Sequence, residues 1–342
     1  MLHAADARGV ARLGVDAVSG VTDIVEAMHA AIARPSWPIG PAGPARTAGI
    51  TGFVYRAVRG STQLVGKGLE AAIDGIDRAR SALGPDAGPA APSIRREALL
   101  AALNGVWGDH LVASGNPLAI PMTLRVEGRV IDPACGPAPG HDGRRLLVLA
   151  HGLCMNDLQW RRGGHDHGEA LARAAGWTPL YLHYNSGRHV AENGHAFAAL
   201  LEDLVSRWPV PLDEIAIVGH SMGGLLARSA CHLGALSDAA WLAKLSTLVF
   251  LGTPHHGAPL ERGGHVIDRV LGASPYVAPF ARLGRARSAG ITDLRHGALR
   301  DEDHISDDRF VHARDTRVPT PLPEGVRAFV IAATTAERTG GR

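Results

Sequence analysis

The first third of the chain carries apolar side chains at three- and four-residue intervals, the spacing that is typical of amphipathic helices. Proline- and glycine-rich breaks interrupt these runs, because neither residue continues a helix well. The pattern predicts helices over residues 10–32, 50–83 and 93–112, and with them a helical N-terminal extension over 1–115. Such stripes fit helices that pack on each other or on the rest of the protein. The alternative is a lipid-facing helical pair, which the mixed rather than basic charges disfavour.

Further along the chain, short apolar runs alternate with helical segments. Residues 122–126 and 129–131 flank Glu127-Gly128 and predict a hairpin. Near-continuous apolar runs of strand length follow, and strands are expected at 146–149, 179–184, 215–218, 248–251 and 326–333. This alternation is typical of a buried, mostly parallel sheet with helices on both faces. We predict an α/β domain over 116–342, with an insertion over about 258–323 that covers the site as a cap or lid.

The segment Gly219-His220-Ser221-Met222-Gly223 matches the pattern G-x-S-x-G. It lies between the apolar run 215–218 and a helical run, so a strand, a turn and a helix follow one another. In that setting the serine occupies a sharp turn, and the flanking glycines remove side chains where strand and helix come close. Ser221 is therefore the predicted nucleophile, next to the positive end of a helix dipole.

A second glycine-containing turn, His151-Gly152-Leu153, directly follows the apolar run 146–149. Hydrolases with a serine elbow hold the oxyanion with two backbone N–H groups. One comes from the residue after the serine, and the other comes from a loop after an earlier strand. The predicted oxyanion hole therefore consists of the N–H groups of Met222 and Leu153. Because both donors are main-chain groups, the side chains at these positions matter little.

These motifs resemble those of bacterial α/β-hydrolase-fold lipases and esterases, in a subgroup related to the GPI inositol-deacylase hydrolases. The resemblance covers a little under half the chain. Besides the two motifs above, it rests on Tyr184-Asn185-Ser186-Gly187 with His189, Asn193-Gly194, residues 251–259, residues 287–291 and Asp293-Leu294-Arg295. It implies a serine nucleophile, a histidine base oriented by an acid, ester or lipid substrates, and no cofactor.

The order of catalytic residues on this fold is serine, acid, histidine. The resemblance puts the acid after the strand expected at 326–333 and the histidine after one further strand. Residues 334–342 contain one acid, Glu337, and no histidine, so a fold that lacks its last strand and helix is expected. Three explanations stay open: a truncated reading frame, a recruited histidine such as His255 or His256, and a non-catalytic descendant that binds ligands.

Composition narrows the function classes. With 35 basic and 33 acidic residues the formal net charge is +2, which gives no electrostatic case for a nucleic-acid partner. Three cysteines, Cys135, Cys154 and Cys231, form no disulfide framework and fit a cytoplasmic location. No apolar run reaches the roughly 18 residues of a transmembrane helix, although peripheral membrane contact stays open. Neither His165-Asp166-His167 nor Asp303-His304 is a recognised ligand set, so no metal is expected.

The motifs together predict a serine-dependent carboxylic-ester hydrolase of lipase or esterase type, in which Ser221 forms an acyl enzyme. The expected partner is an ester or lipid substrate. The alternative is a C-terminally truncated or catalytically impaired α/β hydrolase that acts as a binding or interaction protein.

Overall fold

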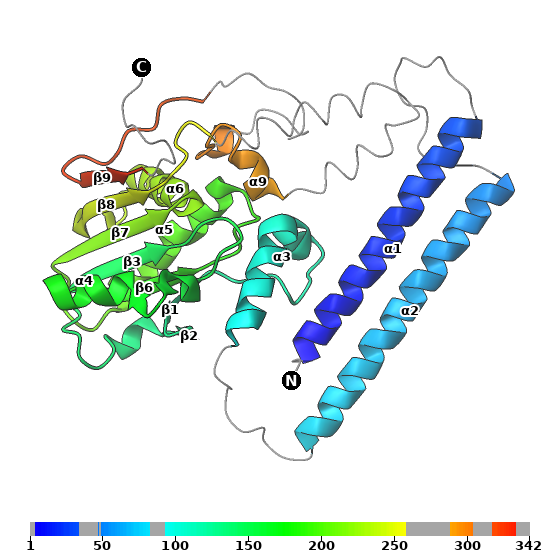
Figure 1. The fold of residues 1–342 in the computed structure, drawn as a ribbon, viewed down its shortest axis with the longest axis horizontal. Coiled ribbons are helices and arrows are strands. Elements are labelled where there is room, and N and C mark those ends of the chain that lie inside the picture. Colours follow the sequence, from blue (N-terminus) through cyan, green and yellow to red (C-terminus); the bar gives the residue numbers. More distant parts are fainter. Residues whose placement is uncertain are drawn as a thin grey trace. The chain divides into compact units, whose positions relative to one another are not determined.

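The computed structural model describes residues 4–33, 47, 49–82, 93–257, 288–303 and 317–332 (Figure 1). Most of the expected lid lies outside these residues, as do Glu337 and the two proline- and glycine-rich breaks. The chain divides into two compact units. One contains the first two helices and residues 110–119, and the other contains residues 92–109 and the sheet. The domain boundary at residue 115 stays a prediction.

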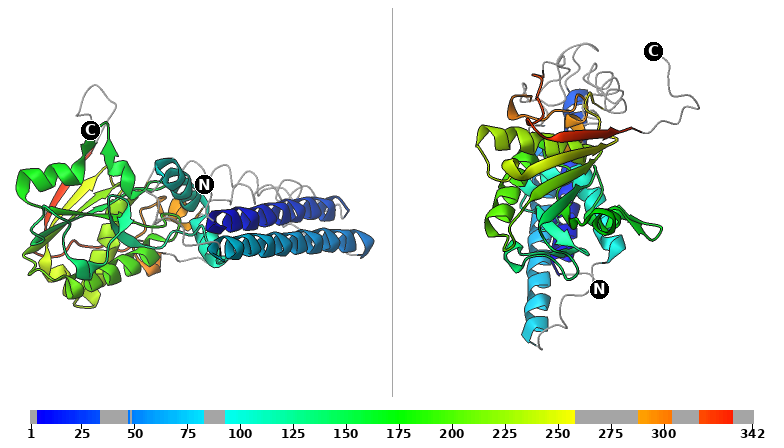
Figure 2. Two further views of the ribbon diagram at one scale, coloured as in Figure 1. Left: turned by 90° about the horizontal axis from the view of Figure 1, so that it is seen from below. Right: turned by 90° about the vertical axis from the view of Figure 1, so that its left-hand side faces the viewer.

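The first unit contains two long helices, α1 (Ala4–Ala33) and α2 (Gly49–Ala82), which lie side by side (Figures 1 and 2). Ion pairs join them, and the pairs are Arg8–Asp74, Arg12–Glu70, Arg59–Asp23 and Arg59–Glu26. The start of α1 pairs with the later part of α2, and residues further along α1 pair with the earlier part of α2. The two helices are therefore antiparallel. No helix among the described residues combines the length and hydropathy that a membrane span requires.

The second unit is built on a seven-stranded sheet in the order β2-β1-β6-β3-β7-β8-β9. Its strands are β1 (Thr123–Val126), β2 (Arg129–Val130), β3 (Arg145–Ala150), β6 (Thr178–His183), β7 (Glu214–His220), β8 (Leu245–Leu251) and β9 (Arg327–Ile331). The five strands from β6 to β9 in this order are parallel, whereas β1 runs antiparallel to both of its neighbours. The mostly parallel sheet is thus confirmed.

The expected hairpin is also confirmed. β1 and β2 pair with Arg125 opposite Val130, and Glu127 and Gly128 form the connection. Both connecting residues have positive φ, 50° and 74°. A two-residue turn with this backbone matches the twist of the flanking strands, which is why a glycine in second place is favoured.

Helices cover both faces of the sheet, as Figure 1 shows for α4 on one side and α5 and α6 on the other. The helices are α3 (Ile94–Ala113), of which residues 94–109 belong to this unit, α4 (His167–Ala175), α5 (Val190–Arg207), α6 (Met222–Leu236) and the short α9 (Ala289–Asp293). Successive residues of β3 enter different cores, because side chains alternate along a strand. Leu146 packs with Phe197 and Leu226, while Leu147 packs with Trp160.

Candidate active site

Ser221 occupies the sharp turn between β7 and α6. Its φ of 51° and ψ of −118° lie outside the regions that side-chain-bearing residues normally adopt. The backbone is held there on both sides, because Ser221 N donates to Leu251 O at 2.8 Å and Gly224 N donates to Ser221 O at 3.1 Å. Strained backbone of this kind clusters at functional sites, and a strained serine between strand and helix is the geometry of a nucleophile elbow.

The loop after β3 lies directly against this elbow. A Cβ placed on Gly152 would stand 3.2 Å from the Cβ of Ser221, so the loop approaches the serine as closely as packing permits. Leu153, the next residue, packs with Met222 in an apolar cluster that also contains Val190 and Leu225. The structure therefore brings together the three residues that the sequence proposes for catalysis.

His151, the first residue of the loop after β3, is held by contacts with Tyr184. It is fully buried, and its ring stacks on Tyr184 with the ring centroids 4.3 Å apart. The Tyr184 hydroxyl donates to the carbonyl oxygen of His151 at 2.8 Å. Burial lowers the pKa of His151 to about 3, so its ring is neutral at pH 7. A ring this weakly basic is a poor general base, and its contacts assign it to holding the loop.

We expect acid to weaken the fold through His151. The ring has a pKa near 6.5 in an unfolded chain, but about 3 when buried. Below pH 6.5 the unfolded state therefore binds more protons, and stability falls until the pH reaches the folded value. The loss is up to about 1.4 kcal/mol per pH unit, or roughly 2 kcal/mol between pH 6.5 and 5. Denaturant unfolding at pH 6.5 and at pH 5 measures the free energy of unfolding. Its decrease between the two pH values should be about 2 kcal/mol smaller in His151→Phe than in the native chain. Equal losses in the two proteins would contradict this expectation.

A second histidine lies near the loop after β3 in a carboxylate–imidazole pair. Nδ1 of His189, at the start of α5, is 3.0 Å from Oδ1 of the buried Asp293. The other carboxylate oxygen of Asp293 accepts the N–H of Val190 at 2.7 Å. Val190 belongs to the apolar cluster of Leu153 and Met222, so the pair ties α9 to the site. Both residues occur in the motifs of the resemblance, but no local pattern predicts that they pair.

His255, one of the two histidines considered as the base, lies beside Arg228, with 3.2 Å between its Nδ1 and the guanidinium Nη1. Burial and the positive charge of Arg228 lower the pKa of His255 to about 4. Because Arg228 donates to Nδ1, the proton of the neutral ring is on Nε2, which then accepts no second proton. This arrangement disfavours His255 as the base. His255 and His256 both line a cavity of about 610 Å³, together with Arg228 and Arg317.

The other histidine-containing segments considered in the sequence, at His220 and at residues 165–167, make packing and capping contacts. The His220 ring, next to the nucleophile, lies edge-on to Trp160 with the centroids 6.4 Å apart. Asp166 caps α4 by accepting the N–H of Glu169, and it also accepts the Tyr181 hydroxyl at 2.5 Å. Among the described residues, no group of three or more histidine, cysteine or acidic side chains is arranged to hold a metal ion.

Residues 146–313 match the family model of the PGAP1-like alpha/beta domain. No curated protein shows significant sequence similarity to the chain. Among solved structures, the mature lipase of Bacillus licheniformis is 18% identical, with a TM-score of 0.36 over 61% of this chain and 70% of that one. An inhibited esterase B from Lactobacillus rhamnosis is 15% identical, with a TM-score of 0.31 over 61% and 69%. A lipase-esterase related protein from Clostridium acetobutylicum is 10% identical, with a TM-score of 0.29 over 53% and 72%.

The matched region begins at the second residue of β3 and includes the loop after β3, the turn that carries Ser221 and the segment that carries Asp293. The mostly parallel sheet with helices on both faces has the architecture expected of an α/β-hydrolase fold, and residues 146–313, just under half of the chain, are similar to the PGAP1-like alpha/beta domain.

Proposed function

We propose that this chain is a serine-dependent hydrolase of carboxylic esters. The observation that carries the proposal is the backbone of Ser221, which is held at positive φ between β7 and α6 with the oxyanion loop against it. A structural turn at this position has no need of a strained serine, whereas a nucleophile must stand clear of the strand with its hydroxyl exposed to substrate. The match to a family of α/β hydrolases supports the same reaction class.

The proposed reaction is acyl transfer in two steps. The Ser221 hydroxyl oxygen bonds to the ester carbonyl carbon, while a general base takes the hydroxyl proton. The negative oxygen of the tetrahedral intermediate accepts hydrogen bonds from the N–H groups of Leu153 and Met222. The C–O bond to the alcohol then breaks, and the alcohol leaves with the proton. Water repeats the sequence on the acyl enzyme, releases the carboxylic acid and restores the serine.

The two proposed donors have no competing acceptor in the part of the chain that the structure describes. Met222 is the first residue of α6, where backbone N–H groups lack partners within the helix. Leu153 stands in the loop between β3 and the following turn, and its side chain faces the apolar cluster. An oxyanion that forms at Ser221 would accept hydrogen bonds from both groups, and the helix dipole would add to the stabilisation.

A fluorophosphonate probe, which bonds covalently only to activated serines, tests the proposal. We expect the full chain to be labelled, and Ser221→Ala to remain unlabelled. Ser237→Ala is a matched control, because Ser237 is an exposed residue at the other end of α6. Labelling that persists in Ser221→Ala would assign reactivity to another residue. An unlabelled native chain would overturn the proposed function and favour a ligand-binding role.

A further inference from the structure

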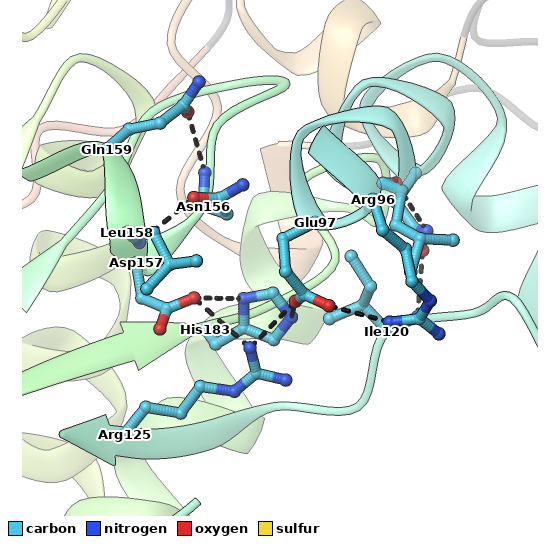
Figure 3. Close-up of polar contacts among 11 residues, drawn as sticks. Arg96, Glu97, Ile120, Arg125, Asn156, Asp157, Leu158, Gln159 and His183 are labelled. Atoms are coloured by element: carbon cyan, nitrogen blue, oxygen red, sulfur yellow. Dashed lines mark hydrogen bonds and ion pairs between the residues drawn. The ribbon is translucent and has the colours of Figure 1, made fainter. Parts of the chain in front are cut away.

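Four charged or titratable side chains meet at the amino-terminal half of α3 (Figure 3). Arg125 of β1 is central, and its Nη1 lies 3.0 Å from Glu97 Oε2 and 3.4 Å from Asp157 Oδ1. His183, the last residue of β6, has Nδ1 2.9 Å from Asp157 Oδ1 and Nε2 3.9 Å from Glu97 Oε2. The exposed fractions are 15% for the Arg125 side chain and 6% or less for the other three. We name this set the buried charge network.

The buried charge network adjoins both ends of the oxyanion loop, residues 151–156. Asp157 follows the loop directly and begins a short helical turn, which Asn156 caps by accepting the N–H of Leu158 (Figure 3). At the other end, the residue after His183 is Tyr184, whose ring and hydroxyl hold His151. Arg125 and His183 thus hold Asp157 at the end of the loop, and His183 leads directly into Tyr184, which holds His151 at its start.

The helix α3 contacts the middle of the same loop at Gly105, which has no side chain to hold the two apart. A Cβ on Gly105 would stand 2.2 Å from the Cys154 sulfur and 2.9 Å from its backbone nitrogen. Ser288 Oγ donates to the Gly105 carbonyl at 2.6 Å, and so joins the helix to the segment before α9. The close fit at Gly105 means that a small movement of α3 changes the space available to the loop.

Cys154 is itself held in an unusual backbone conformation, with φ of 58°. Its N–H donates to Ser186 Oγ at 3.0 Å, and its half-buried thiol faces the Ala102 carbonyl on α3. A residue with a side chain keeps positive φ only where its surroundings enforce it. Leu153 is the preceding residue, so the peptide group that Ser186 holds lies one peptide away from the proposed oxyanion donor.

We propose that Glu97, Arg125, Asp157 and His183 are positioning residues that clamp α3 onto the oxyanion loop and so set the direction of the Leu153 N–H. The inference rests on the proposed function of Ser221. Glu97 is the member on α3, Asp157 is the member that follows the loop, and Arg125 bridges the two carboxylates. Removing the bridge takes away the cation that Glu97 and Asp157 share. Glu97 then keeps the Arg96 guanidinium at 2.7 Å and Asp157 keeps the His183 ring at 2.9 Å, so the direct link between α3 and the residue after the loop is lost.

The competing explanation is that the buried charge network only stabilises the fold and does not position the loop. The two explanations differ in what a conservative change does to the loop. If the network only adds stability, Glu97→Gln lowers the free energy of unfolding but leaves the folded loop unchanged. If it clamps α3, the same change exposes Cys154 and weakens oxyanion stabilisation in protein that is still folded.

The first measurement is the rate at which iodoacetamide alkylates Cys154 in the folded full chain. A Cys135→Ser background removes the exposed thiol, and Cys231 is buried. We expect Arg125→Met and Glu97→Gln to raise the Cys154 rate by about 10-fold or more. The matched controls are Arg145→Met and Glu214→Gln, because Arg145 and Glu214 form a 2.7 Å ion pair at the opposite end of β3. The controls should leave the rate within about twofold of the native chain.

The second measurement is kinetic, on a short-chain ester. Misplacing one oxyanion donor should lower kcat by about 10- to 100-fold in Glu97→Gln while KM changes little, since the donor acts in the transition state. An unchanged alkylation rate in Glu97→Gln, with circular dichroism showing a folded protein, overturns the clamp. An unchanged kcat overturns it as well. A native chain that is inactive and unlabelled at Ser221, but whose Cys154 responds as expected, defeats the proposed function and leaves the clamp as a structural device.

Discussion

Replacing Ser221 with alanine should lower kcat for ester hydrolysis by about 10⁶-fold, the size of loss that follows removal of a serine nucleophile from its catalytic unit. The change deletes only the hydroxyl group. The remaining rate, about 10³–10⁴ over water, would come from substrate binding and from the N–H groups of Leu153 and Met222. Steady-state kinetics on a short-chain ester, with protein purified in parallel, measures the effect.

Alanine keeps the Cβ at the strained position, and Ser237→Ala provides the comparison for loss of a serine hydroxyl elsewhere on the same helix. Ser237 lies at the C-terminal end of the same helix, where its hydroxyl donates to the Leu233 carbonyl at 3.0 Å. Its replacement should leave kcat within about twofold. A Ser221→Ala protein that keeps more than a tenth of the native kcat would show that ester hydrolysis takes place at a different group.

Gly223→Ala should destabilise the hydrolase unit by several kcal/mol, and the protein should be found largely in inclusion bodies or degraded. A Cβ at this position would lie 2.2 Å from the Ala150 carbonyl oxygen and 2.6 Å from that of His151. Both atoms belong to the backbone of β3 and the start of the oxyanion loop, so no flexible side chain can move aside. Overpacking of this kind typically costs 1–3 kcal/mol and more where backbone must shift.

Gly60→Ala is the control for this chemical change. Gly60 lies within α2, where an added Cβ meets no atom within 4 Å, so alanine should stabilise the helix by about 0.5–1 kcal/mol. Thermal unfolding of the soluble fraction compares the two variants. A Gly223→Ala protein with native Tm and native fluorophosphonate labelling would mean that β3 and α6 separate more easily than their close approach indicates.

The strands and helices could be predicted because each is specified by residues close together in the sequence. Near-continuous apolar runs require burial on both faces of a sheet, and glycines flank the serine where strand and helix meet. The elbow and the loop after β3 were found for the same reason. Their chemistry depends on backbone groups at fixed offsets along the chain, which a linear pattern records.

The supporting contacts could not be predicted in this way. His189 and Asp293 are 104 positions apart, and Arg125 meets Glu97 and Asp157 across three separate elements. Such pairs depend on where the fold places distant segments, whereas each residue alone is typical of a solvated surface. Gly105 resembles an ordinary weak point in a helix until its contact with Cys154 is known.

The ion pairs between α1 and α2 also give this hairpin a built-in polarity. Arg8 and Arg12 lie in the first half of α1, opposite Asp74 and Glu70 in the second half of α2. The signs of the charges are exchanged further along the hairpin, where the acidic Asp23 is on α1 and the basic Arg59 is on α2. Turning either helix end over end would set arginine against arginine and carboxylate against carboxylate. The charges therefore select one orientation of two otherwise similar apolar stripes, a form of specificity that holds even where each pair adds little stability.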